Sequence, residues 1–565
     1  MRRALVVTLL AVVAVVLGSA APAAAHAALV STTPASQARL TEPPTEIVLT
    51  FDEPVEATLG GIRLYDATEQ RIALGEARRV PGDDTQLRAP IEEDIADGLF
   101  VVTWRATSED GHPVSGAFTF QVGTAAPADT SGLIARLLAG EGDDSTVGAL
   151  LAVARFVGYV GLALLVGGFA FLALAWPAGA TRPGARRMLW LGWGLAVAGA
   201  LGMFVLQGPY ATADSLGAAL DTGLWRDVAE TRTGRAGLVR LAAAAAAVVL
   251  VVLVRKVRTS WWQAVAATTT AVLAFSVAFA GHAGTGRWHL VGLLLGVLHV
   301  AAVTVWLGGL AYLAFAVLRT PQAAPARAVG AAVATSEVEP AVDARENVTL
   351  AVRRFSSVAF VAVVVAVATG VVQGWRLVES WAALWDTDYG RLLVLKTALV
   401  TVMVVTAAFA RGIVRRRWPA PGQLRRVVLV EVALAVAILG VTAVLVGTPP
   451  ATATSGSKPF STTMVQADTI ASITIDPARD GVDNALHVYI SPPGGALARV
   501  DSVTARLSLP ERQLGPIPVP LGEEGVNHYS AYGVQLPFAG EWQLEVLVST
   551  PPGQTMRFAT PFDVS

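Results

Sequence analysis

Apolar runs long enough to cross a lipid bilayer recur through the middle of this chain and restrict what it can fold into. A transmembrane helix needs about 20 mostly apolar residues. The sequence contains eight such runs, at about 148–176, 188–211, 236–254, 261–281, 290–318, 354–378, 390–411 and 425–447. With 53% hydrophobic and only 15% charged residues, the chain is also too apolar for an ordinary soluble protein. The sequence therefore predicts a multi-pass membrane protein.

Basic residues indicate which loops face the cytoplasm. They follow the first, third, fifth and seventh runs, and they are Arg182, Arg186, Arg187, Arg255, Lys256, Arg258, Arg319, Arg353, Arg354, Arg411, Arg415, Arg416 and Arg417. Loops rich in Lys and Arg stay on the cytoplasmic side of a membrane. Since the number of runs is even, the segments before and after them are both expected on the extracytoplasmic side of the inner or plasma membrane.

The N-terminus has the layout of a secretory signal peptide. Two arginines precede an apolar run in residues 2–16, and small residues follow. Ala23 and Ala25 form the Ala-x-Ala pattern after which signal peptidase cuts. Residues 1–25 are therefore a predicted signal peptide. This export agrees with the side of the membrane that the basic loops predict.

Cleavage after Ala25 makes His26 the first residue of the mature chain. A free α-amino group and an imidazole on one residue can chelate one metal ion, and both nitrogens suit Cu(II). Any residue can follow a cleavage site by accident, and a cut after Ala21 or Ala24 would remove this terminus. Position alone therefore leaves the chelate open.

Residues 26–123 have the pattern of a small all-β domain, a sandwich or a barrel. Pro, Gly and Asp separate short β-rich runs at 46–51, 61–65, 99–107 and 117–122. The segment has 16 Asp and Glu against 7 Arg and no Lys. An acidic surface attracts cations and repels nucleic acid, so no nucleic-acid partner is expected. The whole chain has no cysteine, which excludes disulfides and thiolate metal sites.

A second group of candidate ligands lies in the segment Ser108-Glu-Asp-Gly-His-Pro113. Asp110 and His112 are two residues apart, so their side chains can converge on one side of an extended or turning segment. With the two nitrogens of His26 they would give three nitrogens and one oxygen, which suits tetragonal Cu(II). The alternative is an Asp-Gly turn with a surface histidine. Protons compete for the same lone pairs, so metal affinity should fall as pH drops through about 8 and about 6.5.

Residues 26–34, 48–55 and 104–116 resemble the periplasmic copper-binding protein family CopC. The resemblance implies a cupredoxin-like β-barrel whose Cu(II) site uses the N-terminal amine, His26, Asp110 and His112. Some members place a further carboxylate at the position of Glu53, which is expected to support the ligands without binding the ion directly. Members with a separate Cu(I) site carry a Met-rich loop. This segment has no Met, so we expect it to bind Cu(II) alone.

Residues 124–147 read as a linker, and three histidines follow in the membrane region: His282, His289 and His299. Intramembrane ionisable residues are costly and suggest function. His289 and His299 are about 15 Å apart along one helix, so they cannot share an ion, but all three could be stations on a copper path. The alternative is that such a histidine only hydrogen-bonds a neighbouring helix.

Residues 281–283, 298–310, 354–356, 369–370 and 389–396 resemble the inner-membrane copper resistance protein family CopD. The resemblance covers about 148–447 and implies eight helices that move copper across the inner membrane. Copper held by nitrogen and oxygen donors would need reduction first, so Cu(I) is a second expected cargo of this part. A periplasmic copper donor or reductase is an expected partner.

Residues 448–464 read as a linker and 465–565 as an extracytoplasmic β-sandwich of immunoglobulin-like type. Its expected strands lie near 472–475, 487–490, 542–548 and 556–562, and it resembles small β-domains of the YtkA type. His487 and His528 are interpreted as lone structural or surface histidines, without a site.

The sequence thus predicts a CopC–CopD copper resistance and transport protein that is not an enzyme. It would capture Cu(II) outside the cell and pass copper to the membrane part. Two alternatives stay open. A copper mono-oxygenase also uses an N-terminal histidine chelate, although Asp110 would fill the position that oxygen needs. A b-type cytochrome would bind haem between His282 and His299.

Overall fold

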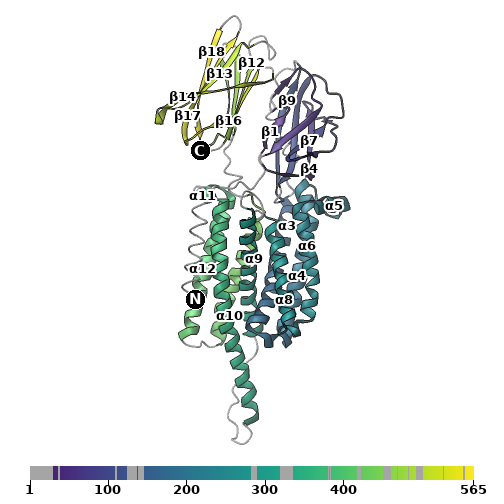
Figure 1. The fold of residues 1–565 in the computed structure, drawn as a ribbon, viewed down its shortest axis with the longest axis vertical. Coiled ribbons are helices and arrows are strands. Elements are labelled where there is room, and N and C mark those ends of the chain that lie inside the picture. The colour runs from purple at the N-terminus through teal and green to yellow at the C-terminus, as the bar shows by residue number, and fades with distance from the viewer. Residues whose placement is uncertain are drawn as a thin grey trace. The chain divides into compact units, whose positions relative to one another are not determined.

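Two all-β regions flank a series of long helices along the chain in the computed structural model (Figure 1). The structure describes residues 29–35, 38–51, 53–108, 111–123, 136–137, 145–281, 289–318, 335–378, 381, 383–416, 421–449, 460–466, 469–476, 478–480, 483–491, 500–525, 527–550 and 554–564. The predicted signal peptide, His26, Asp110 and His282 lie outside the described residues. The chain divides into two compact units: one joins the helices with Gly111 and His112, and the other contains the strands.

The first β-region folds into two sheets, as the alternating pattern of the sequence predicts. Their strand orders are β1-β3-β7-β6 and β2-β9-β8-β4-β5. The strands are β1 (Leu29–Thr33), β2 (Ala38–Leu40), β3 (Glu46–Phe51), β4 (Val55–Asp66), β5 (Arg71–Ile72), β6 (Arg78–Val80), β7 (Asp83–Pro90), β8 (Gly98–Ser108) and β9 (Pro113–Val122). In β3, Ile47, Leu49 and Phe51 are buried and alternate with more exposed residues. This two-residue period places one side of each strand in the core.

Eight helices among the described residues are long and apolar enough to cross a membrane, as predicted. The candidate spans are Thr146–Ala175, Pro183–Thr212, Arg232–Val252, Ser260–Phe279, His289–Val317, Asn347–Leu377, Asp388–Phe409 and Gln423–Leu445. The helices are α3 (Ser145–Ala170), α4 (Pro183–Thr212), α5 (Thr222–Glu230), α6 (Arg232–Ala246), α7 (Val248–Val252), α8 (Ser260–Phe279), α9 (His289–Tyr312), α10 (Thr335–Leu377), α11 (Ala383–Asp386), α12 (Asp388–Arg416) and α13 (Pro421–Leu445).

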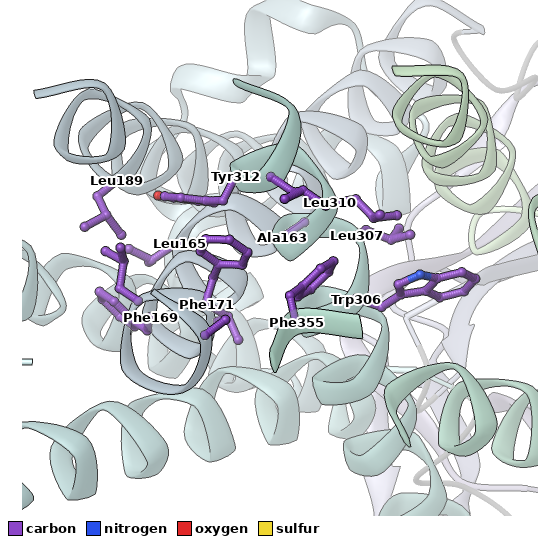
Figure 2. Packing of buried hydrophobic residues seen from close by; sticks show 14 of the residues in the cluster. Ala163, Leu165, Phe169, Phe171, Leu189, Trp306, Leu307, Leu310, Tyr312 and Phe355 are labelled. Atoms are coloured by element: carbon purple, nitrogen blue, oxygen red, sulfur yellow. The ribbon is translucent and has the colours of Figure 1, made fainter. Parts of the chain in front are cut away.

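Small residues let the central helices approach closely, as is typical of membrane helix packing. A Cβ atom added to Gly308 of α9 would collide with the backbone oxygen of Ala163 in α3. Next to this contact, large rings fill the remaining space. Figure 2 shows Phe171 beside Tyr312 and Phe355, and the ring centroids lie 5.8 and 5.3 Å from that of Phe171. Phe171 begins a short π-helical turn, η1 (Phe171–Ala175), that continues α3.

The C-terminal β-region also consists of two sheets around a common core, in which Trp542 is fully buried. The strand orders are β10-β11-β12-β16-β15 and β14-β13-β17-β18. The strands are β10 (Phe460–Gln466), β11 (Thr469–Asp476), β12 (Asp483–Ser491), β13 (Ser502–Leu509), β14 (Leu514–Val519), β15 (Gly522–Gly525), β16 (His528–Gln535), β17 (Gly540–Thr550) and β18 (Gln554–Val564). All four predicted strands of this region are therefore confirmed. The interpretation of its two histidines as lone residues is wrong, because His487 and His528 are in contact.

Candidate functional site

The turn between β8 and β9 carries two of the predicted Cu(II) ligands. Thr107, near the end of β8, pairs with Pro113 at the start of β9, so β8 and β9 are antiparallel neighbours, and the Asp-x-His positions lie between them in the sequence. Of its two candidate ligands, the structure describes His112, which is only 5% exposed. His112 is thus buried, and its role as a metal ligand stays a prediction.

Strand register brings other predicted positions to the same end of the first β-region. Val55, the first residue of β4, pairs with Ser108, the last residue of β8. Glu53 comes two residues before Val55 and is half-buried. Leu29, the first residue of β1, pairs with Phe51 immediately upstream of this segment. Strand β1 thus starts at the end of the first β-region where β4 begins and β8 ends.

The hydrogen bond of His112 determines which of its nitrogens could bind a metal ion. Its Nε2 lies 2.8 Å from the backbone oxygen of Val446, within the helical unit. A carbonyl oxygen only accepts, so Nε2 carries the proton and the lone pair of the neutral ring is on Nδ1. Metal-binding histidines commonly donate their other N–H to a backbone carbonyl in this way. The role of His112 as a copper ligand stays a prediction.

A cavity of about 770 Å³ lies within the helical unit, and Gly111 and His112 are part of its lining. The backbone oxygen of Gly111 accepts a hydrogen bond of 3.0 Å from Gln207 Nε2 of α4. A Cβ atom on Gly111 would lie 2.7 Å from Thr233 Oγ1, and its φ of +85° favours glycine. The segment that carries His112 is thus closely fitted to the helices at this cavity.

His299 of α9 lines the same cavity. Its Nδ1 lies 3.0 Å from the backbone oxygen of Ala366 and 3.0 Å from Thr369 Oγ1, both on α10. The bond to the carbonyl assigns the proton to Nδ1 and leaves the lone pair of the neutral ring on Nε2. The predicted helix-to-helix hydrogen bond exists, and it also orients the ring as it would orient a metal ligand.

The charges of the cavity lining are all positive. Arg155, Arg240 and Lys396 belong to the lining, and no Asp or Glu is among the described residues that form it. Arg240 donates to the backbone oxygen of Ser276 at 2.8 Å and contacts Met203 Sδ at 3.6 Å. The sulfur of Met203 is therefore already engaged by a cation.

Sequence reasoning did not single out these three cations, nor Gln207. Charged residues inside apolar runs could have revealed Arg155, Arg240 and Lys396, since such residues are rare in membrane spans. His289, by contrast, is exposed at the first turn of α9 and is not part of the described lining. The structure thus brings His112 and His299 to one cavity, and it does not bring His289 there.

Three family models match this chain. Residues 29–123 match the CopC domain, 144–290 the copper resistance protein D-like N-terminal domain, and 349–445 copper resistance protein D. Copper transport protein CutJ of Bacillus subtilis (strain 168) is 26% identical over 83% of this chain and 83% of its own length. Protein YobA of Escherichia coli (strain K12) is 35% identical over 17% of this chain and 79% of its own. Copper resistance protein C of Escherichia coli is 31% identical over 19% and 89%.

The helices and strands define a class of protein: a multi-pass membrane protein with one β-region before its helices and another after them. The CopC and CopD matches cover the first β-region and most of the helices. The chain belongs to the copper resistance and transport proteins that contain CopC and CopD domains.

Proposed function

We propose that this copper transport and resistance protein captures Cu(II) outside the cell and passes copper into the cavity between its membrane helices. In this proposal the ligands are the amine and imidazole of His26, with Asp110 and His112, and Glu53 supports them from outside the ligand shell. The observation that carries the proposal is the position of His112, a candidate ligand that also lines the cavity containing His299. The hydrogen bond of His299 leaves its Nε2 with a lone pair for copper.

The charges of the cavity bear on the oxidation state of the cargo. Three positive side chains and no described carboxylate line it. Coulomb repulsion grows with the charge of the ion, so a divalent ion is opposed about twice as strongly as a monovalent one. We infer that copper crosses this cavity as Cu(I), with His299 as an intermediate ligand. An external reductase or reduced donor would supply the electron.

The test compares two histidine variants in the full chain. His112→Ala removes a proposed Cu(II) ligand, so its affinity for Cu(II) should fall by about 100-fold or more. His299→Gln leaves the capture site intact, so Cu(II) affinity should stay unchanged while radiolabelled copper accumulation by expressing cells falls by about 10-fold or more. Isothermal titration of the purified protein measures the first effect, and copper uptake measures the second.

His289→Gln is the matched control, because it removes an imidazole from the same helix at an exposed position outside the described cavity lining. Its copper accumulation should match that of the unmodified protein. Equal accumulation by the His299→Gln variant and this control would refute the proposed path. N-terminal sequencing of the mature chain must also give His26, since another terminus would remove the amine ligand.

One observation favours a second candidate, a haem-binding membrane domain. A haem needs an axial imidazole and cations for its two propionates, and the cavity offers His299 Nε2 together with Arg155, Arg240 and Lys396. His282, the other expected axial ligand, lies outside the described residues. A Soret absorption band in the purified protein that disappears in the His299→Gln variant would favour this function over copper transport.

A further inference from the structure

A second cavity, of about 720 Å³, is lined by residues of α3, α4, α9 and α13. Its volume is typical of small-molecule sites, which measure about 300–1,000 Å³. Ala163 and Leu307 (Figure 2), together with Leu439, line both this cavity and the one that contains His299. Leu191 and Val436 of its lining are 55% and 46% exposed. The second cavity therefore opens at the surface of helices that a bilayer would surround.

The second cavity extends from one end of the helices to the middle of the membrane spans. At the first end, Arg182 lies immediately before α4, and Phe315 belongs to η6 (Leu313–Val317), which continues α9. At the other end, Val160 is at the middle of the span Thr146–Ala175, about 22 Å along the helix from Ala175. One leaflet contributes about 15 Å of hydrocarbon, so the cavity is deep enough for an acyl chain of one leaflet.

Positive charge lies at the outer end of this cavity. The described lining contains two charged residues, Arg182 and Arg187, and both are exposed. No ion pair or side-chain hydrogen bond joins either guanidinium to another described residue. All other described residues of the lining are apolar or glycine. Both arginines belong to the basic segment after the first apolar run, which the sequence predicts on the cytoplasmic side.

The first turn of α4 adds backbone donors at the same end. Pro183 and Gly184 begin this helix and line the cavity, and no side chain caps the helix start. The first N–H groups of a helix have no intrahelical partner, and the positive end of the helix dipole attracts anions. A Cβ atom on Gly184 would meet no atom within 4 Å, so there is space for a ligand beside this turn. This end of the cavity suits a phosphate group, and the rest suits a hydrocarbon chain.

We propose that the second cavity binds an anionic phospholipid of the cytoplasmic leaflet. Its phosphate lies at Arg182, Arg187 and the start of α4, and one acyl chain follows the apolar lining. Guanidinium groups bind phosphate through paired hydrogen bonds, and anionic lipids are abundant in this leaflet. A zwitterionic lipid also has a phosphate, but the cation of its headgroup repels the arginines. The proposal goes beyond the copper function and does not depend on it.

The test is a lipid titration of the full-length protein, purified in detergent and freed of lipid, followed by native mass spectrometry. We expect phosphatidylglycerol to bind about 10-fold or more tightly than phosphatidylcholine, and the Arg182→Gln/Arg187→Gln variant to lose this preference. Arg255→Gln/Arg258→Gln is the matched control. It removes the same charge from exposed positions outside the described lining, so it should keep the preference. Equal preference in both double variants would overturn the proposal.

A second pair of variants tests the apolar part of the cavity. Val436→Trp fills the cavity from an exposed position, so phosphatidylglycerol affinity should fall by about 10-fold or more as the acyl chain loses its contacts. Val430→Trp, at a 53% exposed position of the same helix outside the described lining, should bind as the unmodified protein does. A thermal melt verifies that both variants fold.

Equal binding by the two tryptophan variants would mean that only the headgroup is bound and that no chain enters the cavity, which would overturn the proposal. A dimer in the mass spectra that Val436→Trp dissociates and Val430→Trp does not would identify a second copy of the chain as the occupant and would also overturn it. Copper accumulation by expressing cells tests the proposed copper path, and neither result depends on it.

Discussion

At the scale of single residues, the low pKa of His528 makes the stability of the C-terminal β-region dependent on pH. Burial lowers this pKa to about 3, against about 6.5 in an unfolded chain. Between these values the unfolded state binds the extra proton, so folding stability is lost as pH falls from about 6.5 toward 3. The loss is at most about 1.4 kcal/mol per pH unit. Hydrogen exchange of β12 and β16, corrected for intrinsic rates, should therefore increase between pH 7 and pH 5.

His528→Phe removes the titrating group and keeps an aromatic ring against Tyr489. Protection of β12 and β16 in this variant should change little over the same pH range. His289→Gln, an exposed histidine in the helical unit, serves as the control and should retain the full dependence. A slope that is the same in the protein and in His528→Phe would mean that another group controls the acid response.

Single residues also show which features could be predicted from the sequence and which could not. His112 was predicted as a ligand because a short spacing, Asp-x-His, suffices to suggest it. The contact between His487 and His528 depends instead on which strands become neighbours and in what register, and that is decided by the packing of the whole β-region. The positive cavity lining has the same origin, because Arg155, Arg240 and Lys396 come from three separate helices.

At the scale of secondary-structure elements, the helix pair α3–α9 depends on glycine. Gly308→Val should separate these helices, because any side chain there collides with backbone of α3 that cannot move independently. Overpacking of this kind costs about 1–3 kcal/mol or more, so the melting temperature in detergent should fall by about 5 °C or more.

Gly194→Val is the matched substitution, since a Cβ atom on Gly194 of α4 meets no atom within 4 Å. Its melting temperature should change by about 1 °C at most. If both variants melt at the same temperature, close contact between α3 and α9 does not limit the stability of the helical unit.

The helices and strands could be predicted because the sequence patterns that identify them are local. All eight apolar runs correspond to candidate spans, since about 20 apolar residues identify a membrane helix without knowledge of its neighbours. In β3 the alternation of apolar and polar residues gave the strand the bounds that the structure has, Glu46–Phe51. The π-helical turn η1 was not predicted, because it arises where α3 meets the rings of Tyr312 and Phe355.

At the scale of the whole molecule, the even number of spans and the basic loops predict that both β-regions face the same side of the membrane. The chain has no cysteine, so single introduced cysteines can be labelled without background. Gln70→Cys, Gln554→Cys and Arg258→Cys each place a thiol at an exposed position in the first β-region, the last β-region and the loop between α7 and α8.

A membrane-impermeant maleimide should label the Gln70→Cys and Gln554→Cys variants in intact spheroplasts, and the Arg258→Cys variant only after the membrane is opened. Copper capture outside the cell requires this arrangement, because the proposed chelate forms only after the signal peptide is removed on that side. Labelling of Arg258→Cys in intact spheroplasts would reverse the orientation and place the capture site in the cytoplasm. Labelling of only one β-region would require an odd number of spans, and one of the eight apolar helices would then not cross the bilayer.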